Sequence, residues 1–548
     1  MTRTSPPGPE RRAFAGLAAL MVAPVLAQGL WRPLEHWLGA AGTARELTGA
    51  ALVICAFNAV VQGLVRPVVG RALLAGLATV ALTASLSLGA AGFGALLPVA
   101  VVSAFLVDAL PPRLPSELDG IVRRNRLLSV LYGLFALLSV AWISRVSVFI
   151  GDPTVVEYQA LPGEEFTETH SCLTAYVRAS ELARQGVENL YEDPWWYGSR
   201  GLPPLPEGEA DPWEPFELDN FSYPPPFLLL TTPLAPLDGD FLAQRALWFG
   251  LNGILAALGM WVVARWLDGR AAHRALLLAP LFLGSVPVLL TLQIGNFHLL
   301  AVVLSVLAMV ALERAQTTRG AALLALTTLS KISPGVLGIG LLVRRRAREV
   351  AYTAGFGALL LGLAALVFGP EPLVSFVRYA LPRLSSGAAF PFMDTDAGLA
   401  TNMGPFGIPF KLKFLGFNVG DPWRIAPWVS RVYTIGLVTL AVASARRQAD
   451  RRDRAIRWMA LLALAAMQSP FSPAYSLLGL LWATTLVAVE VRRAREAVAL
   501  AALWPALLFV PPGLSVAELS VLSIAQTTLA LGVCAWLAVR APRLPELP

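Results

Sequence analysis

The chain is built from repeated apolar blocks, each about 17 to 24 residues long and nearly free of charged side chains. A helix of about 20 apolar residues crosses the hydrocarbon core of a bilayer, and soluble domains rarely contain such blocks. Of the 548 residues, 56% are hydrophobic and only 14% are charged, whereas about 25% are charged in a typical soluble domain. We therefore predict an all-α polytopic integral membrane protein.

About fourteen of these blocks have the length of a membrane-spanning helix. They cover residues 13–31, 47–64, 72–90, 93–110, 127–150, 242–264, 274–292, 297–313, 350–368, 426–444, 458–471, 475–491, 497–512 and 518–539. Arginine clusters follow alternate blocks, as is typical of cytoplasmic loops. We expect a multi-pass protein of the cell inner (plasma) membrane with both termini cytoplasmic. We attribute the net charge of +7 to this topology and expect no nucleic-acid partner.

One apolar segment, residues 320–343, does not fit a single crossing because basic clusters flank it on both sides. It is interrupted at Lys331-Ile332-Ser333-Pro334-Gly335, where proline removes a backbone donor and glycine loosens the helix. Two half-length helices in a re-entrant hairpin would keep both basic clusters on one side. Broken helices at membrane depth are tolerated only when they pack inside the protein or line a cavity, so we expect this hairpin to line a site.

Two long loops are expected on the extracytoplasmic side. The first, residues 151–223, is strongly acidic, and its middle at 171–185 has helical spacing. The second, residues 369–425, carries four cations on a side that the positive-inside rule leaves poor in them, namely Arg378, Arg383, Lys411 and Lys413. Sugar transfer from a lipid phosphate would use both loops, because a base takes the acceptor proton and cations stabilise the leaving phosphate. Composition alone leaves this as one function among several.

Short motifs follow one another in a fixed order along the chain. They are Ala175-Tyr176-Val177-Arg178-Ala179, Asn189-Leu190-Tyr191-Glu192, Phe221-Ser222-Tyr223-Pro224-Pro225-Pro226-Phe227, Thr232-Pro233-Leu234-Ala235, Gln293-Ile294-Gly295-Asn296, Leu329-Ser330-Lys331-Ile332-Ser333-Pro334, Asn402-Met403-Gly404-Pro405-Phe406-Gly407 and Ser469-Pro470-Phe471-Ser472. Together they resemble glycosyltransferase family 87, which contains polyprenol-phosphate-sugar-dependent enzymes of the GT-C type, mannosyltransferases among them. The resemblance covers roughly residues 127–490.

The resemblance implies an organisation and an activity. Residues 1–126 would be additional transmembrane helices, 127–490 a GT-C-like catalytic module, and 491–548 C-terminal transmembrane helices. The implied activity is inverting transfer of a sugar, with mannose as the first candidate, from a polyprenyl phosphate to an extracytoplasmic lipid or glycan acceptor by a general-base mechanism. Polyprenyl-phosphate sugar, the acceptor and membrane lipids would be the partners. We expect no cofactor and no obligatory metal, since the adjacent acids at 164 and 165 are weak support for a divalent cation.

The sequence departs from the family pattern at the expected base. The family typically has Asp about four residues before the first-loop Tyr, where this chain has Cys172. The nearest proton acceptors are His170 and Glu168, and Asp152 is the next candidate. In an extended segment His170 and Glu168 would face the same side and could share the role, with a carboxylate orienting the imidazole. The family also tends to have His at the position of Tyr475.

The remaining candidates bind the donor or line the substrate site. We expect Lys331, Arg378 and Arg383 to bind the donor phosphate, the alternatives being snorkelling for Lys331 and ion pairs with the acidic loop for the arginines. Substrate-lining candidates, which could equally be structural, are Tyr176, Tyr223, Gln293, Asn296, His298, Asn402 and Tyr475.

Two other functions stay open at this point. A transporter or flippase of a lipid-linked sugar would fit the many spans and the broken helix. The sequence indicates only one break and no internal repeat, which argues against this class. A non-catalytic glycan-binding relative would fit the missing Asp.

Overall fold

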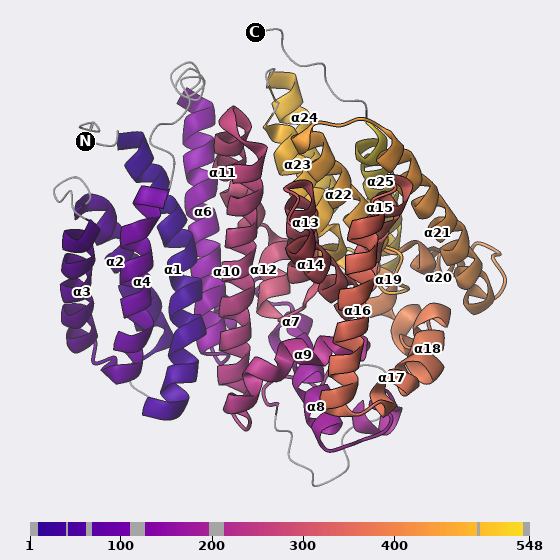
Figure 1. Ribbon diagram of the computed structural model, residues 1–548, viewed down its shortest axis with the longest axis horizontal. Helices are drawn as coiled ribbons and strands as arrows, with labels where there is room; N and C mark the ends of the chain where they lie inside the picture. The colour runs from indigo at the N-terminus through magenta and orange to yellow at the C-terminus, as the bar shows by residue number, and fades with distance from the viewer. Residues whose placement is uncertain are drawn as a thin grey trace. The chain divides into compact units, whose positions relative to one another are not determined.

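The computed structural model describes residues 9–39, 42–61, 68–109, 126–196, 213–489, 491 and 494–540. These residues form helices joined by loops, and no β-strand occurs among them (Figure 1). The predicted all-α class is confirmed. Residues 197–212 of the acidic first loop lie outside the described residues. Residues 110–125, which contain one of the arginine clusters expected to be cytoplasmic, also lie outside them.

Helices occupy the described part of each predicted apolar block. The helices of these blocks are α1 (Pro9–Leu38), α2 (Ala44–Val61), α3 (Val68–Ser85), α4 (Gly89–Ala109), α6 (Arg126–Gly151), α10 (Phe241–Leu267), α11 (Gly269–Leu283), α12 (Val286–Gln293), α13 (His298–Glu313), α16 (Ala347–Phe368), α21 (Pro422–Arg446), α22 (Arg451–Ala466), α23 (Leu478–Ala488), α24 (Ala494–Leu508) and α25 (Val516–Val539). The broken segment forms α14 (Thr317–Ser330), η5 (Ser333–Gly335) and α15 (Val336–Val343). Shorter helices in the loops are α7 (Glu165–Thr169), α8 (Cys172–Arg184), η3 (Pro225–Phe227), α17 (Glu371–Ser375), η6 (Phe376–Ala380), α18 (Leu381–Ser386), η7 (Pro391–Asp394), α19 (Asp396–Thr401), η8 (Pro405–Gly407), α20 (Ile408–Phe414) and η9 (Ala474–Leu477).

Six helices among the described residues are long and apolar enough to cross a membrane: α1, α6, α10, α16, α21 and α25. A bent pair formed by α11 and α12 brings this number to seven if it counts as one span. These helices support a membrane-embedded protein. The higher number of about fourteen spans stays a prediction.

The block at 274–292 is not the single straight span that we predicted. Its two halves meet at an angle of 59°, with the break after Gly284. Gly284 lies so close to α6 that an added Cβ would be 2.2 Å from the hydroxyl oxygen of Ser139. Pro287 then lacks the backbone donor of a continuous helix. The described part of the chain therefore has a second broken helix, which we did not predict although Gly284 and Pro287 are both helix-breaking residues.

The break at Lys331 lies where the sequence predicts it. α14 begins just beyond Glu313 at the end of α13, and α15 ends just before Arg344, whose guanidinium lies 3.8 Å from the Glu313 carboxylate. Arg346 lies 3.4 Å from the same carboxylate. The segment therefore returns to the end of α13 from which it left. Lys331 is about 21 Å along α14 from this end, since each helical residue rises about 1.5 Å. A re-entrant path through the membrane stays a prediction.

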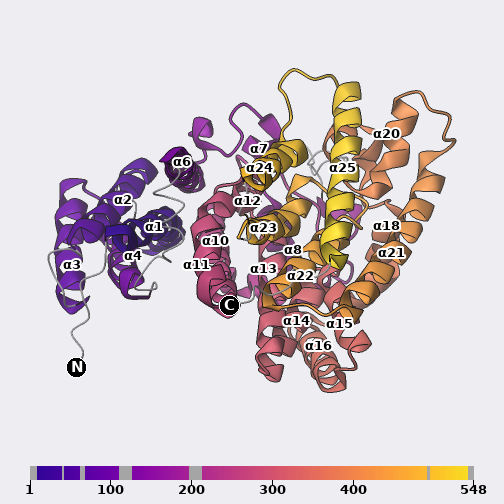
Figure 2. The same ribbon diagram turned by 90° about the horizontal axis from the view of Figure 1, so that it is seen from above.

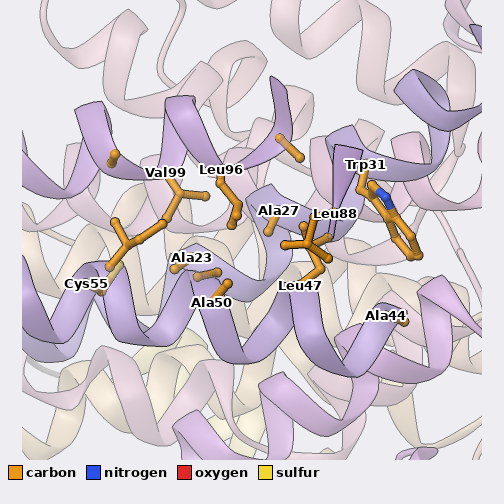
Figure 3. Close-up of a cluster of buried hydrophobic side chains, with 14 of the residues drawn as sticks. Ala23, Ala27, Trp31, Ala44, Leu47, Ala50, Cys55, Leu88, Leu96 and Val99 are labelled. Atoms are coloured by element: carbon orange, nitrogen blue, oxygen red, sulfur yellow. The ribbon is translucent and has the colours of Figure 1, made fainter. Parts of the chain in front are cut away.

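The chain forms two compact units, and the three-part division stays a prediction. The first unit consists of the described residues within Met1–Leu173, Asp211–Glu217 and Pro233–Asn296. In this unit α1 to α4 pack around small and branched apolar side chains, including Leu88 and Val99 (Figure 3). α1 also packs on α10, where a Cβ added to Gly29 would lie 2.6 Å from the Cα of Gly250. The N-terminal helices therefore dock tightly on a helix of the family-like region.

The second unit consists of the described residues within Thr174–Ala210, Leu218–Thr232 and Phe297–Pro548. Its central helix is α22, which is buried continuously from Ala455 and packs against α13, α21, α23 and α25 (Figure 2). α16, in contrast to α22, is largely exposed, because only 6% of its apolar stretch is buried. An apolar helix that is exposed along its length is what a lipid-facing span requires.

Candidate active site

Lys331 lies beside the aromatic residues of the first loop, within the second unit. It follows α14 in an extended conformation, and its ammonium nitrogen lies 5.4 Å from the centre of the Tyr223 ring. A cation at this distance over an aromatic face is attracted by the ring quadrupole. The Tyr176 hydroxyl donates to the Tyr223 hydroxyl at 3.0 Å, and the Tyr191 hydroxyl donates to the Tyr223 carbonyl at 2.9 Å. Lys331, Tyr176 and Tyr223 are thus brought together.

His298 and Tyr475 belong to the same cluster. His298 is the first residue of α13 and is only 2% exposed. The imidazole lies 6.0 Å from the Tyr475 ring, near the Ser476 backbone and within electrostatic range of Lys331. Since α13 ends and α14 begins at the same place, His298 and Lys331 share the opposite end of this helix pair. Five of the predicted site residues therefore meet here.

Asn402 has a different surrounding. Its side-chain oxygen accepts from the Gly404 N–H at 2.8 Å and from the Ser472 N–H at 3.0 Å. Its amide nitrogen donates to the Pro470 carbonyl at 2.8 Å, and the Met403 N–H donates to the Ser472 carbonyl at 2.8 Å. Asn402 is 0% exposed. It joins the Asn402 motif to the Ser469 motif, just ahead of Tyr475, so its observed contacts are structural.

The predicted phosphate-binding arginines lie on the second loop. Arg383, on α18, forms an ion pair with Asp193 of the first loop at 2.9 Å, and its guanidinium lies 5.0 Å from the Tyr379 ring. Arg378, on η6, is exposed. The ring of Phe376, also on η6, packs 5.7 Å from that of Tyr191, which hydrogen-bonds to the Tyr223 backbone. The cationic loop therefore packs on the same first-loop segment that contacts Lys331.

Gln293 organises part of the first loop, within the first unit. Its side-chain oxygen accepts from the Ala160 N–H at 2.6 Å, and its amide nitrogen donates to the Thr167 carbonyl at 2.8 Å. It is 0% exposed. Both contacts are with backbone groups, which is the structural alternative that the sequence left open. Gln293 thereby fixes the segment that leads to Glu168 and His170.

Buried Arg245 supports this arrangement from α10. Its guanidinium donates to the Phe149 carbonyl at 3.3 Å and to the Gln293 carbonyl at 3.3 Å, so it binds the C-terminal ends of both α6 and α12. The ring of Phe216 lies 4.4 Å from the guanidinium carbon. A cation at a helix C-terminus interacts favourably with the helix dipole. Arg245 was not among the predicted site residues, although an arginine inside an apolar block is a recognisable signal.

The expected pairing of His170 with Glu168 is wrong, because the segment is not extended. Glu168 lies in α7, and His170 caps this helix. The Glu168 carboxylate accepts from the Gln159 amide at 2.8 Å. The His170 ring instead stacks on Phe166, with 4.4 Å between centroids. The two side chains are therefore held by different partners.

Cys172, at the position of the family Asp, contacts His170. Its sulfur lies 3.3 Å from His170 Nε2 and 3.3 Å from the Asn296 amide nitrogen. His170, Cys172 and Asn296 thus form one polar cluster in the first unit. The contacts of Asp152 are with other residues. Its carboxylate accepts from the Thr154 N–H and from the Thr154 hydroxyl, just after α6.

Comparison with known protein families finds a match over somewhat less than half of the chain. Residues 221–473 match glycosyltransferase family 87. This part of the chain belongs to that family. The protein is therefore a glycosyltransferase, and the prediction of a transferase is confirmed. No curated protein matches the chain.

The region that matches glycosyltransferase family 87 is shorter than the region, roughly residues 127–490, over which the motifs resemble that family. It includes Tyr223, Lys331 and His298 of the second-unit cluster and both arginines of the cationic loop. It begins after the first-loop candidates at 152, 168 and 170, and it ends at Pro473, just before Tyr475. The expected base therefore lies in the part of the chain that this family match does not cover.

Proposed function

We propose that this glycosyltransferase transfers a sugar, with mannose as the first candidate, from a polyprenyl phosphate to an extracytoplasmic lipid or glycan acceptor. The observation that carries the proposal is the position of Lys331. A cation held over Tyr223 at a helix break inside a family 87 region is suited to a phosphate that gains negative charge as it leaves. Preorganised cations stabilise developing charge most strongly where water is excluded.

A lipid-linked donor is supported by the surroundings of Lys331. The proline-rich η3, two residues after Tyr223, packs against both α14 and α16. α16 exposes a row of leucines, with Leu359 61% and Leu366 83% exposed. In the proposal, the polyprenyl chain lies in the membrane along α16 while its phosphate binds Lys331, with Arg378 and Arg383 as further phosphate ligands.

The proposed reaction is a single displacement. The acceptor oxygen forms a bond to the anomeric carbon as the bond from that carbon to the phosphate oxygen breaks. The electron pair of the broken bond stays on the phosphate, which Lys331 stabilises. The acceptor proton passes to a base, for which His170, Glu168 and then Asp152 are the candidates. Tyr176, Tyr223, Asn296, His298 and Tyr475 are the proposed lining residues.

The experiment that tests this function offers the purified protein two donors in liposomes that contain a lipid extract as acceptor. One donor is radiolabelled polyprenyl-phosphate mannose and the other is a nucleotide-linked mannose. The proposal expects label transfer from the lipid-linked donor alone. Movement of the labelled lipid across the membrane without transfer would establish a flippase, and binding without transfer a glycan-binding relative. The second broken helix makes the flippase comparison necessary.

A further inference from the structure

Lysine is rare in this chain. Of its 43 lysines and arginines only three are lysines, namely Lys331, Lys411 and Lys413. The guanidinium of arginine stays charged in proteins, whereas the amine of a buried lysine can lose its proton. Lysine is therefore the cation that can serve at a site where an uncharged amine is needed.

Lys411 is buried between α20 and α25, outside the predicted spans. Lys411 is only 2% exposed, and its amine donates to the Asn402 backbone carbonyl and to the Ser523 hydroxyl oxygen. Ser523 also donates to the Asn402 carbonyl at 3.0 Å. The next residue of the loop is bound by α25 as well, because Thr527 donates to the Met403 carbonyl at 3.0 Å. Lys411 and α25 together hold the backbone of the Asn402 motif.

The partners of the amine fit an uncharged group. The described contacts of the Lys411 amine are with one backbone carbonyl and one hydroxyl, and no carboxylate is among them. Both observed acceptors are neutral groups. Burial of a charge without an acidic partner is strongly unfavourable.

The charged groups of the elements around Lys411 are exposed. They are Asp394 of η7, Asp421 and Arg424 at the start of α21, Glu518 of α25, and Lys413 of α20 itself. Arg431, farther along α21, is also exposed. Burial lowers the pKa of Lys411 to about 7, and no neighbouring charge contributes to this shift. The geometry and the surroundings therefore favour the same protonation state.

We propose that Lys411 is a positioning residue for the candidate active site, and that its amine is uncharged when the Asn402 motif is correctly held. Protonation would place a charge without an acidic partner in this buried position, which favours withdrawal of the ammonium toward solvent and loss of its contact with the Asn402 carbonyl. Asn402 binds Ser472 and Pro470, and Tyr475 follows three residues later, facing His298. Acidification through the neutral range would thereby disturb the site from a distance. The link to sugar transfer rests on the proposed function.

The direct test does not require transfer activity. The full-length protein is labelled with carbon and nitrogen isotopes at lysine only, and the three side-chain signals are followed by NMR as a function of pH. Substitution of each lysine in turn assigns the signals. We expect Lys411 to titrate near pH 7, well below the ordinary lysine pKa of about 10.4. Titration of Lys411 near that ordinary value would overturn the proposal.

A transfer assay tests the positioning role. The wild type, Lys411→Met and the matched control Lys413→Met are assayed with polyprenyl-phosphate mannose from acidic to alkaline pH. The proposal expects the wild type to lose activity below pH 7 as Lys411 is protonated, and Lys411→Met to lose less. Each protein is compared with its own maximal activity. One pH unit below the lysine pKa, the remaining fraction should be about tenfold lower in the wild type than in Lys411→Met. Lys413→Met should follow the wild type. Identical pH profiles for all three proteins would overturn the positioning role. No transfer by the wild type would instead reject the proposed function and leave the NMR result valid.

Discussion

The ammonium of Lys331 lies 5.4 Å from the centre of the Tyr223 ring, which joins a helix break to the proline-rich part of the first loop. This contact draws on two segments that are about one hundred residues apart in the sequence. Each alone has an ordinary structural explanation, as a snorkelling lysine and as a stiff proline-rich connection. Their meeting inside a family 87 region is what makes a phosphate site the better interpretation.

Removal of the Lys331 charge should weaken donor binding. We expect Lys331→Ala to raise the dissociation constant for the polyprenyl-phosphate donor by about 30-fold or more, the effect of losing about 2 kcal/mol. Lys331→Arg should retain most of the affinity, because it keeps the charge. Lys413→Ala is the matched control, since Lys413 is exposed. Equal affinities in Lys331→Ala and Lys413→Ala would rule Lys331 out as a phosphate ligand.

Arg383 can be tested against its structural alternative. If Arg383 binds phosphate, Arg383→Ala should reduce donor affinity, whereas Asp193→Ala should leave it unchanged or increase it. The ion pair itself should contribute only about 0.2 to 1 kcal/mol to stability, because both side chains are substantially exposed. A double-mutant cycle on thermal stability measures this coupling. Equal loss of donor affinity in the two single variants would assign Arg383 to holding the loops together.

The candidate bases can be separated by rate. Loss of a general base usually lowers the rate about 10² to 10⁴-fold, so His170→Ala or Glu168→Gln should show a fall of this size if that residue acts. Glu168 needs a further control, because it is bound by Gln159. Gln159→Leu removes this contact and keeps the carboxylate. If Gln159→Leu and Glu168→Gln are equally slow, Glu168 is structural, and normal rates in both base variants would move attention to Asp152.

Stability should depend on pH through Lys411. Its pKa is about 7 in the folded protein and about 10.4 when unfolded. Between these values the unfolded state binds more protons, so stability rises with pH by up to about 1.4 kcal/mol per unit. Thermal unfolding at pH 7, 8 and 9 should therefore show a rise in Tm for the wild type that is smaller in Lys411→Met. Parallel Tm profiles would contradict a lowered pKa for Lys411.

The close contact between α1 and α10 should be sensitive to side-chain size. Gly250→Val would place methyl groups where the Gly29 backbone lies, and a Cβ on Gly250 is already only 2.8 Å from the Gly29 Cα. Overpacking of this kind destabilises by about 1 to 3 kcal/mol. Gly436→Val on the exposed part of α21 is the control, since nothing lies within 4 Å of a Cβ there. A similar Tm for both variants would show that the N-terminal helices are not docked through Gly250.

The sequence was most informative where periodicity and charge decide the structure. The apolar blocks and the break at Lys331 could be predicted because proline and glycine interrupt a helix by local chemistry. The bend after Gly284 was not predicted, although Gly284 and Pro287 supply the same kind of signal inside the apolar block. The partners of Glu168 and His170, namely Gln159 and Cys172, could not be predicted, because the fold of the loop brings them together. The burial of Lys411 likewise follows from the packing of α20 on α25.

Product analysis of the transfer reaction tests the central claim most directly. The wild-type protein in liposomes is given anomerically pure polyprenyl-phosphate mannose, and the linkage of the product is determined by NMR. The proposed single displacement predicts a mannosylated lipid or glycan whose anomeric configuration is opposite to that of the donor. A product with retained configuration, or no product from the folded protein with any lipid-linked sugar, would contradict the proposed reaction.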